Sequence, residues 1–467
     1  MTRELLIGDV PLTGARRAPD AVAASLDGEL LTYAGLETMT AKMTSALRAS
    51  GVRRGERVIW QAETSFDALG LYFATARIGA MFVPINPRFT REEAETIIGH
   101  ADPCLILGDA ASGHERIETL LKRADKDPGP LEAPRENDGH VMFYTSGTTG
   151  QSKGCILSQR TQRLRSGEKS VWPRGGELSM FPQFHMSGWH RVLENLMEGN
   201  EVSYVRRPDA EELMEAATRR KPRSAYFIPA VLQRIFALDS SRYDLSSLQV
   251  VDTGTSMVTR DLLDGLARRF PGVSTMIVYG STEVGMATCA GPADGYARAT
   301  TVGRPAPGVL IELSDTGEMI VDSPYLFSGY FRNDEANAKA LIDGRYHTGD
   351  VAERDEEGRY RIIGRVGDLI RTGGEAVAPT EVEEVLLSCP GIAEIAIVGV
   401  PDPTWGQVVT AFVVRDPGQE VTLEALRLHC SSRLVPHKHP RRLEFVDSLP
   451  RTAATNQIQR RKLLERI

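Results

Sequence analysis

The stretch HVMFYTSGTTGQSKG, residues 140–154, joins a short apolar run to a segment of glycines and hydroxyl residues that contains Lys153. The apolar run is typical of a buried β-strand. The segment after it predicts a turn, because glycine adopts backbone angles that other residues avoid. Backbone N–H groups and hydroxyls in such a turn can surround a polyphosphate, and Lys153 adds a positive charge. The spacing differs from G-x-x-x-x-G-K-[ST], so a nucleotidase P-loop is not indicated, and a surface loop without a ligand is the alternative.

Similar apolar runs that end near Gly, Ser or Thr recur between residues 57 and 281, among them RVIWQA, PCLILGD, SAYFIPA, LQVVDTG and STMIVYGS. Between them, SFDALGLYFATARIGA and TRDLLDGLARRF have apolar residues at the spacing of an amphipathic helix. This alternation predicts an α/β fold with largely parallel sheets. Ligands in such folds bind beyond the carboxyl ends of the strands, which is where these turns would gather.

After residue 300 the pattern changes to hairpins and then to a separate mixed segment. LIELSDTGEMIVDSP and VAERDEEGRYRIIGRVGD predict hairpins that turn at Thr316-Gly317 and Glu357-Gly358. The helices and strands predicted beyond Gly367 form a segment of about 100 residues, which is long enough for its own core. We therefore predict an N-terminal domain of residues 1–364, a hinge at residues 365–368 and a C-terminal domain of residues 369–467.

The composition suits a globular enzyme of two or three domains, because 467 residues exceed what one hydrophobic core usually accommodates. The formal net charge of −7 argues against a nucleic-acid partner held by bulk electrostatics. The five cysteines are widely spaced without a C-x-x-C pair, so neither a disulfide framework nor a zinc site is indicated. No run approaches the ~20 apolar residues of a membrane span, and none of signal-peptide length precedes Gly8. We expect a cytoplasmic protein without a membrane partner.

Polar residues that suit catalysis or ligand binding stand in several further motifs. His185 in FPQFHMSGW is as consistent with a core histidine as with a functional one. Glu283 in YGSTEVG follows a turn, and is either a surface carboxylate or a ligand for a hard cation such as Mg²⁺. Asp350 in YHTGD and Arg365 in GRVGD are either charges at hairpin ends or a pair suited to hydroxyl and phosphate groups.

The segment from Tyr144 to Gly154 resembles the phosphate-loop signature of the adenylate-forming superfamily, which includes acyl- and aryl-CoA ligases, adenylation domains of peptide synthetases and luciferases. The later motifs follow in that family's order and extend the resemblance over nearly the whole chain. The resemblance implies an α/β fold with a large N-terminal domain of mixed sheets plus a β-rich subdomain, and a small mobile C-terminal α+β domain. It also implies two reaction steps, in which ATP with Mg²⁺ converts a carboxylate to an acyl-adenylate and CoA then takes the acyl group as a thioester.

By the same resemblance, Tyr279 stacks on adenine, Asp350 accepts the ribose hydroxyls, and Arg365 serves the ribose and phosphate side. Glu283 is implied to act in catalysis by holding Mg²⁺ together with Thr148. The residues implied to bind AMP or ATP are Thr145, Ser146, Gly147, Thr148, Thr149, Lys153, Gly254, Thr255, Ser256, Tyr279, Gly280, Ser281, Thr282, Asp350, Ile362 and Arg365.

The resemblance places His185 beside the reacting acyl group, as a further catalytic residue. Aromatic residues implied to line the acyl pocket, compatible with an aryl acid or a medium acyl chain, are Phe184, Trp189, Tyr226 and Phe227. RTGGEAVAPTEVEE resembles the loop that lines the pantetheine tunnel. The residues implied to bind CoA are Gly373, Gly374, Glu375 and Lys438.

Three positions depart from the family's pattern. VDTGTSMV lacks the usual Gly-Ala-Pro of the adenine stretch, and the hinge has Gly367 where the family has Asp or Lys. PRTAATNQIQRRKL, residues 450–463, matches the C-terminal signature but has Asn456-Gln457 in place of a Gly-Lys pair. That lysine reaches the carboxylate and the α-phosphate during adenylation, and loss of one such preorganised donor typically costs ~10²–10³ in rate.

These departures predict that Gln457 occupies a catalytic position whose lysine is lost, while thioester formation is retained. A separate adenylating ligase would then supply the acyl-adenylate, and the combination resembles the non-adenylating aryl-CoA ligases of platensimycin and platencin biosynthesis. One alternative is a complete ligase in which Lys462 or Lys438 replaces the missing cation. Others are a non-catalytic adenylate-binding protein, or an enzyme that admits another nucleophile to the same tunnel.

Overall fold

The computed structural model describes residues 4–124, 132–146, 152–167, 175–291, 294, 301–451 and 458–467. The chain divides into two compact units. The first contains Met1–Ala299, Pro305–Leu310 and Asp322–Tyr346, and the second contains Thr300–Arg304, Ile311–Val321 and His347–Ile467. The second unit thus begins before the predicted hinge at residues 365–368. A hinge is defined by the motion of two domains, whereas these units are defined by how their residues pack. The hinge at residues 365–368 and the domain boundary there therefore stay predictions.

One sheet of the first unit contains the strands that flank the predicted phosphate turn. Its strand order is β17 (Gly329–Tyr330), β7 (Ser152–Ser158), β6 (Gly139–Ser146), β4 (Met81–Ile85), β3 (Arg57–Gln61) and β5 (Leu105–Gly108). The pairs formed among β6, β4, β3 and β5 are parallel, whereas β7 pairs antiparallel with β6 and with β17. The strands predicted from RVIWQA, PCLILGD and HVMF are confirmed.

A second run of strands in the first unit carries the other predicted ligand-binding turns. Its order is β13 (Gly285–Ala290), β12 (Ile277–Ser281), β11 (Val250–Gly254), β10 (Ser224–Tyr226), β8 (Glu177–Ser179), β9 (Val202–Tyr204), β1 (Val22–Leu26) and β2 (Glu29–Thr32). The pairs from β12 to β1 are parallel, and the pairs at the two ends are antiparallel. The prediction of largely parallel sheets is therefore confirmed for this unit.

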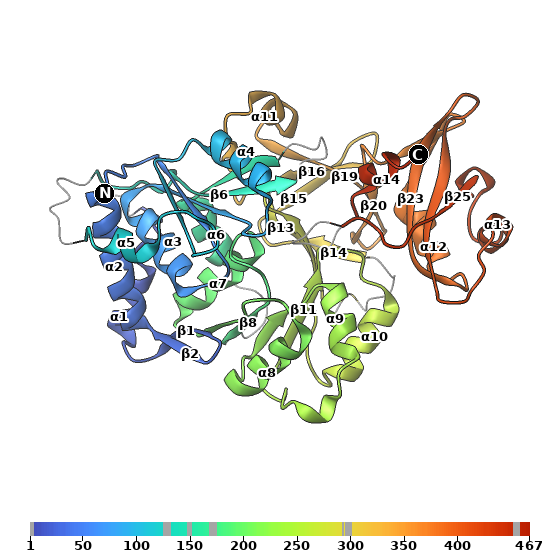
Figure 1. Ribbon diagram of the computed structural model, residues 1–467. Coiled ribbons are helices and arrows are strands. Elements are labelled where there is room, and N and C mark those ends of the chain that lie inside the picture. The colour runs from blue at the N-terminus through green and yellow to red at the C-terminus, as the bar shows by residue number, and fades with distance from the viewer. Residues whose placement is uncertain are drawn as a thin grey trace. The chain divides into compact units, whose positions relative to one another are not determined.

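Helix α3 (Phe66–Ile78) departs from its predicted amphipathic character. Ser65 caps its first turn by accepting from Ala68 N, and Gly79, with φ +67°, ends it. Nearly every residue between these caps is buried, because α3 packs against α2 (Tyr33–Ala49) as well as against strand β4 (Figure 1). A helix that is apolar on all sides is covered on all sides, which explains the difference.

Further helices of the first unit are α1 (Val10–Arg17), α4 (Arg91–Ala101), α5 (Ile117–Leu121), α6 (Gln159–Gly167), α7 (Ser187–Glu198), α8 (Ala210–Arg220), α9 (Pro229–Phe236), α10 (Arg260–Arg269) and α11 (Asp334–Ala340), and the short strand β18 (Leu341–Ile342) follows α11. No helix in the described part of the chain is long and apolar enough to cross a membrane. None of the five cysteines forms a disulfide.

The second unit begins with the two predicted hairpins. Its strands β15 (Leu310–Leu313), β16 (Glu318–Asp322), β19 (Arg345–Arg354), β20 (Tyr360–Arg365) and β14 (Thr301–Pro305) are neighbours in that order. The turns fall at the predicted positions, and Gly317 and Gly358 both have positive φ. Both hairpins are therefore confirmed.

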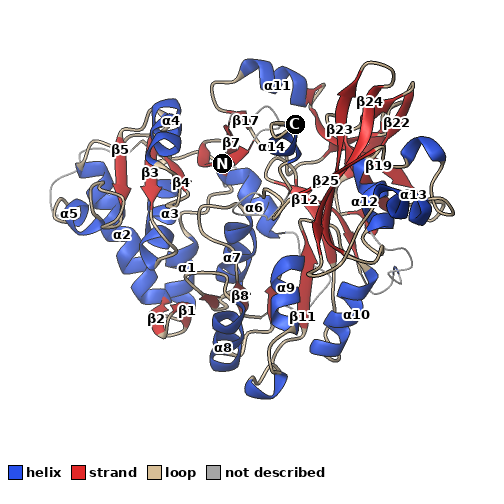
Figure 2. Cartoon of the chain, turned by 45° about the vertical axis from the view of Figure 1, so that its right-hand side comes forward, coloured by secondary structure: helices blue, strands red, loops and turns tan. Residues whose placement is uncertain are grey.

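The rest of the second unit is a sheet with helices packed on it. Strand order is β22 (Glu375–Val377), β21 (Ile370–Thr372), β24 (Gly406–Arg415) and β23 (Ile392–Asp402), and β25 (Arg442–Phe445) pairs with β24. Helix α12 (Pro379–Leu386) contacts β23 and α13 (Leu423–Cys430), and α14 (Arg460–Leu464) also contacts β23 (Figure 2). Helices and strands are thus present beyond Gly367, as predicted.

Alternation along β23 and β24 divides the core of the second unit between two faces, as the two-residue period of a strand requires. Residues of one face pack with α12, and they include Ile395, Ile397, Val409 and Ala411. Residues of the other face, Ala396, Val398 and Phe412, pack with Leu449 and Leu463. Leu463 belongs to α14, so the last turn of the chain is part of this core.

His140 lies in a fully hydrogen-bonded network inside the first unit. Its Nε2 faces the carbonyl oxygen of Tyr72 at 2.7 Å, so this nitrogen donates. Its Nδ1 must then accept from Gln162 Nε2, at 2.6 Å, while the Tyr72 hydroxyl donates to the Gln162 amide oxygen. Burial lowers the pKa of His140 to about 4. A second proton would place an N–H against the Gln162 N–H, so the network holds the neutral ring.

We predict a loss of stability on mild acidification that depends on His140. The unfolded chain binds a proton with the ordinary pKa of 6.5 and the folded ring with a pKa of about 4, so stability falls as the pH drops below 6.5. The loss amounts to about 2 kcal/mol between pH 6.5 and pH 5. Thermal melts across this range should show a steeper decline for the wild type than for His140→Asn. Parallel declines would contradict the role of His140.

Candidate active site

The predicted phosphate turn is held between two paired strands. β6 and β7 place Thr145 opposite Lys153 and Ser146 opposite Ser152. The predicted residues Gly147, Thr148 and Thr149 lie outside the described part of the chain. The structure thus brings the two ends of the turn together, as predicted.

Tyr330 connects Lys153 to Glu283, which sequence reasoning did not anticipate. The Tyr330 hydroxyl donates to Glu283 Oε1 at 2.8 Å, and Lys153 Nζ lies 4.9 Å from the centre of the Tyr330 ring, within cation–π range. Burial and the negative charge of Glu283 raise the pKa of Tyr330 well above its usual range, so the hydroxyl keeps its proton and stays a donor. The lysine of the phosphate turn and the predicted magnesium ligand therefore share one partner.

Arg165 on α6 holds the segment that carries Glu283. Its guanidinium donates to the main-chain oxygens of Thr282 and Glu283, each at 3.0 Å, and of Tyr325 at 2.7 and 2.9 Å. The side chain is only 3% exposed, and an arginine stays charged in proteins. A buried charge is costly unless it is hydrogen-bonded, so the carbonyls stabilise the arginine while it fixes their positions. Sequence reasoning missed Arg165, because nothing in QRTQRLRSG distinguishes it from a surface arginine.

The hairpin of β12 and β13 contains the predicted adenine and phosphate residues. Tyr279 pairs with Thr288 across it, and the Tyr279 side chain is half-buried. Gly280 and Ser281 are the last residues of β12, and Thr282 begins the turn that follows, in which Ser281 Oγ accepts from Glu283 N at 3.2 Å. The motif YGSTEVG therefore places an aromatic ring, hydroxyls and a carboxylate on one short segment.

Gly254 at the end of β11 occupies a position that only glycine fits. Its φ is +153°, and a Cβ there would lie 2.1 Å from the carbonyl oxygen of Val278 and 2.5 Å from the Tyr226 hydroxyl. Thr255 follows with φ +66°, and Ser256 is exposed. Close packing inside the protein therefore explains this glycine, and the role of the stretch in binding adenine stays a prediction.

Aromatic side chains gather around His185, but not all the predicted ones. Phe181 lies between His185 and Tyr226, with ring-centre distances of 5.9 and 5.3 Å. Phe184 is half-buried next to His185. Phe181 was missed, although it stands in the same motif FPQFH.

Two predicted pocket residues pack in the core instead. Trp189 stacks on Tyr72 with ring centres 4.0 Å apart, and Phe227, which is 0% exposed, stacks on Phe270. A side chain without exposed surface offers none to a ligand in this arrangement. Their placement favours a packing role, and a place on the pocket wall stays a prediction.

His185 itself is held as a neutral ring. Burial lowers its pKa to about 4, and its Nδ1 accepts from Ser187 N at 3.2 Å. The proton of the neutral imidazole is then on Nε2. His185 can therefore donate one hydrogen bond from Nε2 near neutral pH, without a positive charge.

In the second unit, Asp350 and Arg365 are direct partners. They face each other across β19 and β20, and Arg365 Nε donates to Asp350 Oδ1 at 2.8 Å. Ile362, predicted to bind nucleotide, lies on the same strand as Arg365, where it pairs with Ala352. The predicted ribose and phosphate residues of this unit are thus together.

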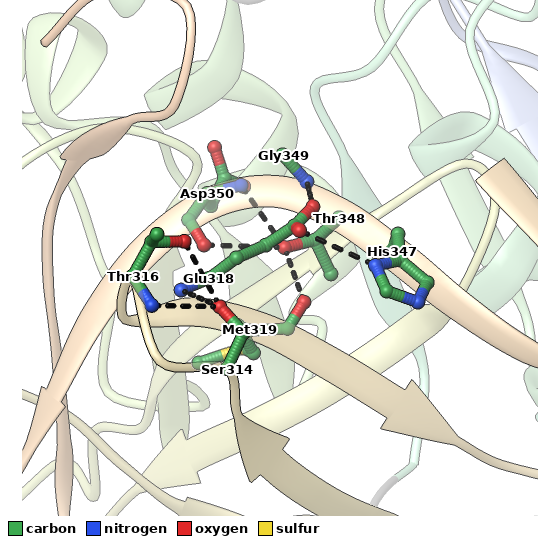
Figure 3. A network of polar contacts seen from close by, with 8 residues as sticks. All are labelled: Ser314, Thr316, Glu318, Met319, His347, Thr348, Gly349 and Asp350. Atoms are coloured by element: carbon green, nitrogen blue, oxygen red, sulfur yellow. Dashed lines mark hydrogen bonds and ion pairs between the residues drawn. The ribbon is translucent and has the colours of Figure 1, made fainter. Parts of the chain in front are cut away.

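A network beside Asp350 was not predicted. Glu318 on β16 contacts His347 and Gly349, and Thr348 contacts both Met319 and Asp350 (Figure 3). His347, Thr348 and Gly349 stand in YHTGD, but only its Asp350 was predicted to bind a ligand. The glutamate stands in the other hairpin, and a sequence does not reveal pairing between hairpins.

The predicted tunnel glycines form the turn between β21 and β22, in which Thr372 pairs with Glu375. A Cβ at Gly373 would lie 2.9 Å from the Trp405 ring, whereas a Cβ at Gly374 would meet no atom within 4 Å. The turn is therefore closed by Trp405 on one side and open at Gly374.

Lys438, predicted to bind CoA or to replace the missing lysine, is already paired. Its Nζ donates to both carboxylate oxygens of Glu381, at 2.6 and 2.7 Å. Lys462, the other candidate replacement, is exposed on α14. The structure therefore favours neither Lys438 nor Lys462 as a replacement for the family's lysine.

Gly367 has no steric need to be glycine in this conformation. Its φ is not positive, and a Cβ there would meet no atom within 4 Å. The structure thus gives no reason for the departure from Asp or Lys, and the predicted freedom of the hinge stays a prediction.

The C-terminal signature is anchored on both sides of its departure. Arg451 and Ile458 form an isolated antiparallel bridge, and Arg460 donates to both carboxylate oxygens of Glu383, each at 2.7 Å. Asn456 and Gln457 lie outside the described residues. Arg451 and Ile458, the described residues on either side of this segment, are therefore paired with each other.

Magnesium chemistry would depend on Glu283 in the first unit. Among the described residues, no group of three or more His, Cys, Asp or Glu could hold a metal ion. Mg²⁺ suits one carboxylate, because it keeps several waters and takes further oxygens from phosphate groups. Glu283, with its second predicted ligand Thr148 outside the described part, fits that donor set.

Comparison with known proteins matches residues 13–331 to the AMP-binding enzyme family and residues 381–455 to the AMP-binding enzyme C-terminal domain. The chain is 31% identical to a feruloyl-CoA synthase of Amycolatopsis sp over 491 residues, covering 96% of each protein. It is 32% identical to an indoleacetate–CoA ligase of Aromatoleum aromaticum over 472 residues, covering 91% of each.

The fold matches the ATP-bound structure of MatB from Rhodopseudomonas palustris, with a TM-score of 0.89, 26% identity and 99% of each chain covered. The prediction of an α/β fold with a large N-terminal and a small C-terminal domain is confirmed by this match. Because the first family match spans more than half of the chain, the protein belongs to the AMP-binding enzyme family.

Proposed function

We propose that this protein is an acyl- or aryl-CoA ligase that works through an acyl-adenylate. The observation that carries the proposal is the fixed carboxylate of Glu283. Arg165 holds its backbone and Tyr330 its side chain, next to the phosphate turn. Such preorganised charges and dipoles around a nucleotide are what acyl-phosphate chemistry requires. Relatives of the chain that cover nearly its full length are CoA ligases by name.

ATP with Mg²⁺, a carboxylic acid and CoA are the substrates that we propose. The support is the family match and the ATP-bound state of MatB, whose fold this chain shares. Glu283 would hold Mg²⁺, which when bound neutralises phosphate charge. Asp350 would accept the ribose hydroxyls and Arg365 would orient that carboxylate, since the two are hydrogen-bonded. This is the complete ligase, which the comparisons favour.

A second candidate is an enzyme that forms only the thioester and receives its adenylate from a partner ligase. The observation in its favour is Gln457 at the position of the family's lysine. A neutral amide cannot stabilise charge that develops between a carboxylate and the α-phosphate as a cation does. The anchors on either side, Arg451 with Ile458 and Arg460 with Glu383, do not involve position 457, so their formation does not require a lysine there.

An aromatic acid is the substrate class that we propose. Phe181 stacks on His185 and lies tilted against Tyr226, and a flat ring packs well against aromatic side chains of this kind. The Tyr226 hydroxyl also lies close to Gly254, so this aromatic cluster adjoins the stretch predicted to bind adenine. The named substrates of both relatives, ferulate and indoleacetate, contain aromatic rings.

Asp350→Ala should remove most of the thermal stabilisation that AMP gives to the wild type. The substitution deletes the acceptor proposed for the ribose hydroxyls, and stabilisation by a ligand follows its affinity. Differential scanning fluorimetry with increasing AMP measures the effect. Asp315→Ala, at an exposed turn of the same unit, is the matched control and should keep the full shift. A wild type whose Tm does not respond to saturating AMP or an acyl-AMP mimic would contradict the proposed function.

Gly374→Leu should block thioester formation from a supplied acyl-AMP while leaving the AMP-induced Tm shift intact. The new side chain would fill the open side of the tunnel turn, although φ +88° also strains it. Gly418→Leu, at φ +76° and equally open, controls for that strain. If Gly374→Leu retains wild-type thioester formation, the thiol enters by another route.

Gln457→Lys should raise ATP–pyrophosphate exchange by ~10² or more, because it restores a charged donor to the adenylation step. Conversion of supplied acyl-AMP to acyl-CoA should change little, and Gln459→Lys is the matched control. Wild-type exchange well above background identifies the complete ligase, whereas its absence together with acyl-AMP conversion identifies the thioester-forming enzyme. Equal exchange by the wild type and Gln457→Lys would show that position 457 does not limit adenylation.

A further inference from the structure

Glu318 reaches from β16 to the segment of β19 that ends at Asp350. Its Oε1 accepts from Gly349 N at 3.0 Å, and its Oε2 lies 3.2 Å from His347 Nδ1 (Figure 3). The Glu318 side chain is 20% exposed, so water competes only in part for these contacts. One carboxylate thereby holds two of the three residues that precede Asp350.

The backbone next to Asp350 leaves regular strand geometry. Gly349 has φ +70°, outside the strand region. Thr348 provides a second tie, since its hydroxyl donates to Met319 O at 2.8 Å and accepts from Asp350 N at 3.0 Å. Three contacts, two from Glu318 and one from Met319, thus hold the segment from His347 to Asp350 against strand β16.

The position of Asp350 follows from this segment. Its amide is held by Thr348 and its carboxylate by Arg365, so a shift of the segment would move the carboxylate against Arg365. Hydrogen bonds from an N–H to a carboxylate are among the stronger ones. A misplacement of about 1 Å in a binding group is enough to lose much of its contribution.

We propose that Glu318 is a positioning residue for Asp350, and that it sets the affinity for the ribose hydroxyls of the nucleotide without touching the nucleotide. The inference rests on the proposed function, which assigns those hydroxyls to Asp350. This positioning role differs from a general role in stability. A residue that acts through Asp350 affects the binding only of ligands that have the ribose hydroxyls.

The test compares AMP with 2′,3′-dideoxy-AMP by calorimetry. The wild type should bind AMP more tightly, and Glu318→Ala should weaken AMP by about tenfold while leaving the dideoxy nucleotide within about twofold. Glu318→Gln should retain most of the AMP affinity, since its amide oxygen can still accept from Gly349 N. Asp322→Ala, at the exposed last residue of the same strand, should bind both nucleotides as the wild type does.

Thr348→Val provides an independent variant should Glu318→Ala fail to fold, and it should show the same selective loss because it removes the second tie. Equal losses for the two nucleotides, or no loss, would overturn the role of Glu318. A wild type that does not prefer AMP over the dideoxy nucleotide would overturn the ribose role of Asp350, and this inference with it. That last result would leave the Gln457 and Gly374 tests of the proposed function standing.

Discussion

The buried guanidinium of Arg165 is the interaction on which the site in the first unit depends. It joins α6, which follows the phosphate turn, to the Thr282–Glu283 segment and to Tyr325. The segment that continues from Tyr325 reaches Tyr330, the partner of Glu283. Parts of the chain more than one hundred residues apart thereby meet around one charge. Because that charge cannot be given up in the folded state, the three segments hold one arrangement before any ligand arrives.

Support from outside the motifs recurs in the second unit. There Glu318 and Thr348 hold the backbone, and Arg365 holds the carboxylate of Asp350. In both units a carboxylate predicted to meet the nucleotide has its main chain and its side chain fixed by different neighbours. Such double fixation limits the conformational freedom that binding would otherwise remove, which favours affinity for a small polar ligand.

Much of this could be predicted from the sequence, because strands such as HVMF and LQVVDTG have local composition that tertiary contacts did not override. The amphipathic character predicted for α3 was wrong, although the apolar residues on every side of FDALGLYFATARI indicate a helix that is covered all round. Residues in the motifs, such as Asp350, were found, whereas Arg165 and Glu318 were not. Both bind main-chain groups, and a backbone N–H or C=O leaves no pattern in the sequence by which its partner could be recognised.

The anchored C-terminus has a consequence for how this chain could change over time. Arg460 and Leu463 secure the last turn to Glu383 and to the core, and Arg451 pairs with Ile458, so none of these anchors involves residue 457. A reacting group can be lost from such a support while the support is preserved by selection for folding. Glutamine and lysine codons differ at a single base, so one point mutation at position 457 exchanges the two residues while both anchors stay unchanged.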